Sequence, residues 1–156
     1  MKRPLALLLP LLLVTVCGGS DIVPRAGTWT YGGSTVVSNS CGSDPPTDPA
    51  GNFTLTLKGD GVFTIDDDEF DPFDCSYEGD AYSCPDRIVG ASKVDNIDAT
   101  IHSNLDIDGT ILSATEVDGT QTVSLTCTGA SCDLATTLSG YTFPCEYSYT
   151  FTATAN

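Results

Sequence analysis

The segment LDIDGTILSATEVDGTQTVSL, residues 105–125, holds two Asp-Gly pairs among apolar residues that alternate with polar ones. Alternation with a period of two is typical of a β-strand that buries one face. Asp-Gly pairs favour two-residue type I′ hairpins, because both central residues of that turn need positive φ. We therefore predict tight turns at Asp108-Gly109 and Asp118-Gly119. In this register Leu112 faces Leu105.

The two turns would sort the surrounding residues onto an apolar and a polar face. A shift of one residue would mix the two sets, so the pattern and the turns support the same register. The predicted apolar face, which we expect to form the core, consists of Ile97, Ala99, Ile101, Leu105, Ile107, Leu112, Ala114, Val123, Leu125 and Cys127.

The same register places Glu116 and Gln121 opposite each other on the core face, beside the second turn. If the fold encloses a pocket, these two residues, with Tyr149 and Phe151, would line its mouth. The alternative is that the two polar side chains reach solvent at the rim.

Two further turns follow the same logic. Gly59-Asp60-Gly61 predicts a three-residue hairpin loop, and Gly79-Asp80 predicts a two-residue turn that pairs Tyr77 with Tyr82. No stretch keeps a helical apolar period for three turns, so we expect an all-β chain. About eight to ten antiparallel strands would bury their apolar faces in an up-and-down barrel stapled by disulfides. A meander β-sandwich is the alternative.

Residues 1–16 begin with basic residues and continue as an apolar run too short to span a bilayer as a helix, which indicates a signal peptide. The residues VTV before Cys17 resemble the lipobox of bacterial lipoproteins. The resemblance implies that Cys17 is diacylglyceryl-modified and anchors the chain, and that Gly18 directs it to the outer membrane. The alternative is an ordinary signal peptide cut further on, near Ala26.

The rest of the chain is long enough for one domain with a single core. We expect residues 17–26 to form a lipidated tether and residues 27–156 to form one β-barrel domain, acting as a monomer at the bacterial outer membrane or outside the cell.

The domain starts with Gly27-Thr28-Trp29, which resembles the Gly-X-Trp motif of lipocalins. Together with Gly33-Ser34-Thr35, the segment is also similar to the start of avidins. In these calycin families the tryptophan packs across the closed end of an antiparallel barrel, so the resemblance implies a barrel with Trp29 beside a small-molecule site. Avidins use several tryptophans to hold biotin, whereas this chain has only Trp29, which does not favour biotin.

Six cysteines follow Cys17, and in an extracytoplasmic protein they predict three disulfides. The turn at residues 79–80 brings Cys75 opposite Cys84 at a non-hydrogen-bonded pair, where Cα atoms lie about 4.5 Å apart. Two sets remain for the other four: Cys127–Cys145 with Cys41–Cys132, expected because Cys127 and Cys145 share the core face, or Cys127–Cys132 with Cys41–Cys145.

Charge limits the partners. Residues 17–156 hold four lysines and arginines against all 21 acidic residues, a formal net charge of −17. Such a surface repels phosphate backbones and anionic headgroups, so we expect no nucleic-acid partner and a membrane attachment made by acyl chains alone.

Two acidic segments are candidate cation sites. The run DDDEFDPFD, residues 66–74, offers Asp66, Asp68 and Asp71, although such a run is usually a solvated loop. Residues 104–116 fit the start of an EF-hand but lack its acid at position twelve. We therefore predict no metal site and no cofactor.

Catalytic motifs are missing from the sequence. The single histidine, His102, lies on the predicted polar face, and no Gly-X-Ser-X-Gly elbow or Cys-His pattern occurs. We expect a non-enzymatic barrel that binds a small apolar or amphipathic molecule. The alternative is a structural surface lipoprotein with a solid barrel, acting through its acidic exterior and loops.

Overall fold

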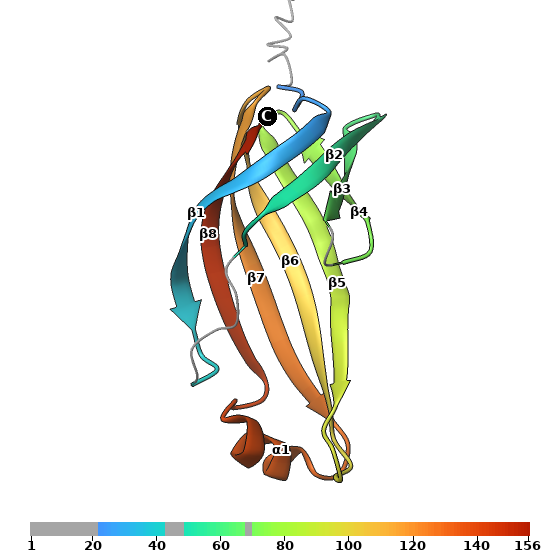
Figure 1. The fold of residues 1–156 in the computed structure, drawn as a ribbon, viewed down its shortest axis with the longest axis vertical. Coiled ribbons are helices and arrows are strands. Elements are labelled where there is room, and N and C mark those ends of the chain that lie inside the picture. Colours follow the sequence, from blue (N-terminus) through green and yellow to red (C-terminus); the bar gives the residue numbers. More distant parts are fainter. Residues whose placement is uncertain (1–21, 43–48, 68–69) are drawn as a thin grey trace, which may run out of the picture.

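The computed structural model describes residues 22–42, 49–67 and 70–156, and the strands in this part of the chain form a closed antiparallel barrel (Figure 1). Each strand pairs with the next in sequence, and the last pairs with the first. The predicted up-and-down barrel is confirmed, and the sandwich alternative is wrong. The elements are β1 (Gly27–Asn39), β2 (Asn52–Gly59), β3 (Val62–Asp67), β4 (Phe73–Glu78), β5 (Ala81–Lys93), β6 (Thr100–Ser113), β7 (Glu116–Thr128), α1 (Cys132–Ser139) and β8 (Cys145–Ala155).

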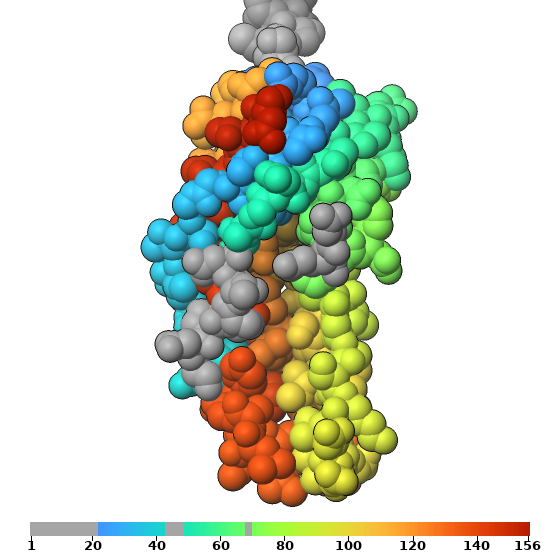
Figure 2. All heavy atoms as spheres, viewed as in Figure 1, coloured from blue at the N-terminus to red at the C-terminus, as the bar shows by residue number. Residues whose placement is uncertain are grey.

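The strands differ in length, and this divides the barrel into two halves. β2, β3 and β4 have 8, 6 and 6 residues, whereas β5, β6 and β7 have 13, 14 and 13. All eight strands surround the upper half, the part nearest the C-terminus in Figure 1. In the lower half β1 and β5–β8 continue toward α1 without β2–β4. The space-filling view shows the same division, with the green atoms of β2–β4 confined to the upper half (Figure 2).

The ladder is therefore incomplete on one side of the lower half. Within the described residues, β4 pairs with β5 only from Ser76 to Glu78, and β2 pairs with β1 only from Gly27 to Thr30. On this side of the barrel, no strand of the described residues pairs with the later parts of β1 and β5.

The short hairpins form as predicted. β2 and β3 are joined at residues 59–61, and across the turn between β4 and β5, Tyr77 pairs with Tyr82. Asp60 and Gly79 adopt the positive φ that these turns require.

The hairpins predicted at the two Asp-Gly pairs are wrong. β6 and β7 run through both pairs without turning and are joined instead at residues 114–115, so that Gly109 lies directly opposite Gly119. Leu105 faces Val123 rather than Leu112. Leu112, predicted in the core, is 46% exposed, and Ala114 is exposed too.

Close packing of aromatic rings explains why glycine occurs at these positions. A Cβ on Gly109 would lie 2.2 Å from the carbonyl oxygen of Asp118 and 2.5 Å from the ring of Tyr82. A Cβ on Gly119 would lie 2.5 Å from the Tyr82 hydroxyl and 2.8 Å from Phe151. The Tyr82 hydroxyl donates a 3.1 Å hydrogen bond to the Asp118 carbonyl. Glycine inside a strand marks such a close approach.

Aromatic and aliphatic side chains fill the upper half. Trp29 is fully buried at the end near the termini, where its Nε1 donates to the carbonyl of Arg25 at 2.9 Å. Its ring stacks on Phe53 with centroids 6.2 Å apart. The core also contains Leu55, Phe63, Ile65, Phe73, Tyr82, Leu105, Ile107, Ile111, Val117, Val123, Leu125, Tyr147, Tyr149, Phe151 and Ala153.

The structure forms three disulfides among its described residues. Cys75–Cys84 joins β4 to β5 as predicted. The favoured pairs Cys127–Cys145 and Cys41–Cys132 are wrong, because Cys41 pairs with Cys145 and Cys127 pairs with Cys132. This second set was the open alternative.

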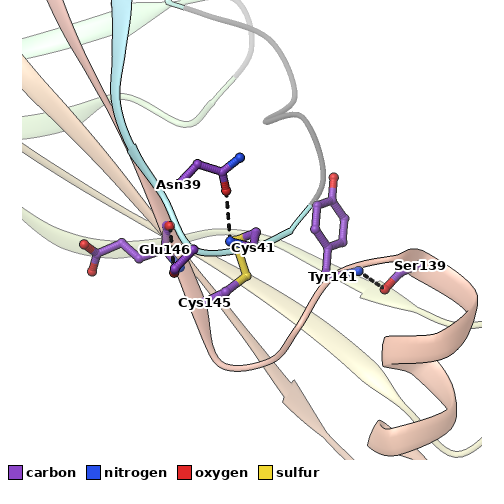
Figure 3. The surroundings of a disulfide bond; sticks show 7 residues. Asn39, Cys41, Ser139, Tyr141, Cys145 and Glu146 are labelled. Carbon is purple, nitrogen blue, oxygen red and sulfur yellow. Dashed lines mark hydrogen bonds between the residues drawn. A yellow bond between two sulfur atoms is a disulfide. The ribbon is translucent and has the colours of Figure 1, made fainter.

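The local geometry favours this second set. Cys41 follows β1, which runs beside β8 as far as the pair Asn39 and Tyr147, so Cys41 lies next to Cys145 (Figure 3). The Asn39 side chain accepts a 2.9 Å hydrogen bond from the Cys41 backbone N–H. The other pair, Cys127–Cys132, connects the end of β7 to the start of α1.

Helix α1 is missed by the sequence analysis, because its eight residues make only about two turns and bury a single residue, Ala135. It ends at Gly140, whose left-handed conformation lets its N–H bond to the carbonyl of Thr136.

The glycine pair supports a stability test. We predict that Gly109→Ala lowers the free energy of unfolding by about 1–3 kcal/mol or more, because the new methyl group overlaps the Asp118 carbonyl and the Tyr82 ring. Gly33→Ala is the matched control, since its Cβ would meet nothing within 4 Å, and should change stability by about 0.5 kcal/mol at most. Urea titration of both variants measures this. Equal stabilities would contradict the close packing at Gly109.

Candidate ligand-binding site

The predicted pair Glu116 and Gln121 does not form. Glu116 is exposed beside the true turn and pairs with Ser113 and Thr154. Gln121 pairs with Ile107 and Tyr149. The prediction fails because the turn lies at residues 114–115, which shifts the register of β7 against β6.

The three aromatic residues predicted to bind a ligand belong to the packed interior. Trp29 and Tyr149 are fully buried, and Phe151 is 5% exposed. Tyr31 contacts Phe151 edge to face at a centroid distance of 5.5 Å. These rings pack in the interior of the upper half, and Phe151 also lines a hollow of about 520 Å³ together with Gly109 and Gly119.

Gln121 is the one polar residue of the prediction that lies on the inner face of the barrel. Its neighbours across both ladders, Ile107 and Tyr149, are buried and face inward, so Gln121 is also on the inner face. It is nevertheless partly exposed, as is Ser103 on the inner face of the lower half. The interior beside Trp29 and Phe151 is therefore closely packed, whereas Gln121 and Ser103 are polar residues of the inner face that keep some contact with solvent.

Arg87 on β5 is the functional candidate that sequence reasoning missed. It pairs with Leu105, which is buried, and thus lies on the inner face. The guanidinium carbon is 3.2 Å from the centroid of the Phe73 ring, a cation–π contact. Its Nε, Nη1 and Nη2 atoms are all buried and have no hydrogen-bond partner in the described part of the chain.

A β-bulge turns Arg87 inward. From Cys84 to Arg87, β5 advances three residues while β6 advances two, from Ile107 to Leu105. Without the extra residue, strict alternation would place Arg87 on the opposite face from Cys84. Pro85 within the strand is the signal that could have found the bulge, because proline inside a sheet is confined to edges and bulges.

An apolar rung surrounds this charge. The pairing continues from Arg87 through Leu105 and Val123 to Tyr147, all buried residues. Burial lowers the pKa of Arg87, while the negative charge of Asp67 opposes that effect. An arginine nevertheless stays protonated in a protein. A buried cation without hydrogen bonds is costly, and such a group is normally paired.

A pocket of about 320 Å³ lies beside Arg87, on the side of the barrel where β4 no longer pairs with β5. This volume is at the lower end of the range for small-molecule sites, about 300–1,000 Å³. Its lining residues are Phe70, Asp71, Pro72, Phe73, Arg87, Ile88 and Val89; five of them are apolar, but the surface that they expose to the pocket is more polar than apolar.

The nearest charged and polar groups leave the guanidinium without a hydrogen bond. Asp67 and Tyr31 are close enough to influence Arg87 electrostatically. Asp67 accepts a 2.8 Å hydrogen bond from the backbone N–H of Phe70. The arrangement thus offers one fixed positive charge, aromatic surface and a small pocket with both polar and apolar surface, which suits binding of an amphipathic molecule.

The acidic segments assemble no cation site among the residues that the structure describes, where no three metal-ligating side chains gather. Asp68, one of the proposed ligands, lies outside the described residues. Asp74, at the end of the same run, accepts a 3.0 Å hydrogen bond from Lys58 on the outer surface, and this contact lowers its pKa. His102 contacts the Thr128 hydroxyl at 2.9 Å.

Comparison with known proteins gives no relative: no protein-family model, curated protein or solved structure matches this chain. In the described ranges, no helix is long and apolar enough to cross a membrane.

The buried tyrosines of the interior give a pH test. Burial raises the pKa of Tyr147 to about 12, and Tyr82 is shifted in the same direction. Unfolded tyrosines ionise near pH 10, so between pH 10 and 12 the unfolded state loses protons that the folded state keeps. We predict that these tyrosines leave the free energy of unfolding unchanged between pH 7 and 9 and make it fall above pH 10. Tyr147→Phe should make this fall shallower in urea titrations at pH 9, 10 and 11; an unchanged slope would contradict it.

Proposed function

We propose that this protein is a non-enzymatic binding module of the bacterial cell envelope that holds a small amphipathic molecule in the pocket beside Arg87. The observation that carries the proposal is the buried guanidinium, which has no hydrogen-bond partner among the described residues and borders a small pocket with both polar and apolar surface. A bound molecule with a polar head and an apolar body would satisfy both features.

The disulfides support an extracytoplasmic location, because such bonds persist in oxidising compartments. We propose further that the signal peptide is removed and that acyl chains on Cys17 hold a monomeric barrel at the outer membrane. Several acyl chains add about 0.8 kcal/mol for each buried methylene, enough for stable attachment. The strongly acidic surface would keep the barrel itself away from anionic headgroups.

A structural lipoprotein is the second candidate. It is favoured by the upper half, whose interior is filled by the chain's own aromatic side chains. In that case the acidic exterior would make the contacts. The two functions differ in whether the lower half takes up a ligand.

Native mass spectrometry distinguishes them. We predict that protein released gently from the membranes of its own cells carries an additional non-covalent molecule of a few hundred daltons, because the pocket is small. The extra mass should disappear after denaturation, which excludes a covalent modification. A mass that corresponds only to the processed chain would favour the structural candidate.

Anchoring is tested by Cys17→Ala. We predict that this variant moves from the membrane fraction to the soluble fraction, because the acyl chains alone hold the chain to the bilayer. Cys127→Ala, which alters a cysteine of the barrel, is the matched control and should leave the protein with the membranes. A Cys17→Ala variant that stays in the membrane fraction would rule out lipid anchoring.

A further inference from the structure

The Arg87 guanidinium has aromatic and apolar neighbours but no hydrogen-bond acceptor among the described residues. The Phe73 ring packs against one face of the guanidinium. The rung on which it lies continues through buried Leu105 and Val123. All three nitrogens lie away from solvent without a hydrogen bond in the described residues. Five N–H donors in a planar fork are thus available for an acceptor that the described chain does not supply.

We infer that Arg87 binds the carboxylate of a monocarboxylic acid whose short apolar chain lies in the pocket formed with Phe70, Pro72 and Val89. This inference rests on the proposed binding function and specifies its ligand class.

Shape and charge favour a carboxylate with one negative charge. The guanidinium fork matches a carboxylate through two parallel hydrogen bonds. Asp67 lies within electrostatic range of Arg87, and the chain after residue 16 has a net charge of −17. One cation in so negative a setting can balance a monoanion, whereas a dianionic phosphate would be repelled.

The pocket limits the size of the apolar part. Its volume of about 320 Å³ admits a small molecule, and Phe70, Pro72, Phe73 and Val89 supply apolar contact. Arg87 lines the same pocket and is itself partly exposed although its nitrogens are covered. We infer that on binding the guanidinium turns from the Phe73 ring toward the pocket through a change of side-chain rotamer.

Calorimetric titration with octanoate and 1-octanol tests the inference, using a soluble protein that carries Cys17→Ala. The two probes have the same chain length and differ in the charge of the head. We predict that octanoate binds more tightly than 1-octanol and that Arg87→Met weakens octanoate binding about 10- to 100-fold without changing 1-octanol binding. Arg87→Lys, which keeps the charge but loses the fork, should give a smaller loss.

Two matched controls separate local from general electrostatics. Lys58→Met removes one positive charge from the outer surface and should leave octanoate affinity within twofold. Asp67→Asn removes the carboxylate near Arg87 and should strengthen octanoate binding, whereas Asp74→Asn on the outer surface should not.

The outcomes separate the two levels of the proposal. If neither probe binds the unsubstituted protein, the binding function itself fails. If both probes bind and Arg87→Met changes neither affinity, the binding function stands and the role of Arg87 is overturned. A thermal melt checks folding: ligand-free Arg87→Met should unfold at or above the temperature of the unsubstituted protein, because an unpaired buried charge has been replaced by an apolar side chain. A lower melting temperature would show that Arg87 is already paired within the chain and would also overturn the inference.

Discussion

The ladder between β1 and β8 is the interaction on which the rest of the structure depends. It runs from the pair Trp29 and Ala155 to the pair Asn39 and Tyr147, and the disulfide Cys41–Cys145 lies just beyond it. A sheet closed in this way has no free edge in its upper half and can fill its interior with its own side chains. Closure also fixes where the two halves differ, because β1 and β8 continue downward after β2–β4 have ended.

The short middle strands and the bulge in β5 together produce the candidate site. Because β4 covers only the first residues of β5, the remainder of β5 borders an unclosed side of the barrel. The bulge after Cys84 then turns Arg87 toward the interior, beside Phe73. The bulge is a feature of the backbone, and it places the positive charge of Arg87 among the apolar residues of this rung. Function, on this account, depends on a local irregularity in the strand, and the regular part of the barrel serves as the scaffold.

The sequence predicts the barrel well where local turn chemistry and strand pairing agree. The hairpins at residues 59–61 and 79–80 form, and so does the bridge Cys75–Cys84, because each depends on residues close together in the chain. The Asp-Gly pairs mislead for a physical reason. A tight turn favours glycine, and so does the close approach of Tyr82 to β6 and β7. The sequence alone does not distinguish these two roles of glycine, because the second depends on the tertiary packing.

The candidate site is harder to predict than the fold. Strict alternation along β5 predicts that Arg87 lies on the outer surface. The extra residue of the bulge places it on the inner face instead. Pro85 indicates that a bulge could occur here but does not indicate which side chains it would turn inward. The residues that the sequence predicted to bind a ligand lie in different parts of the structure. Trp29, Tyr149 and Phe151 are part of the packed interior and Glu116 is on the surface, whereas Gln121 does lie on the inner face. Burial can be predicted from periodicity, but the space left between side chains depends on how far each strand extends.

The central claim is that Arg87 lies inside the barrel without a hydrogen-bond partner among the described residues, and a crystal structure of the ligand-free soluble Cys17→Ala protein tests it most directly. The account predicts a guanidinium that packs on the Phe73 ring, with no carboxylate of the chain within hydrogen-bond distance. An Arg87 side chain on the outer surface, or one paired with Asp67 or another carboxylate of the chain, would contradict it.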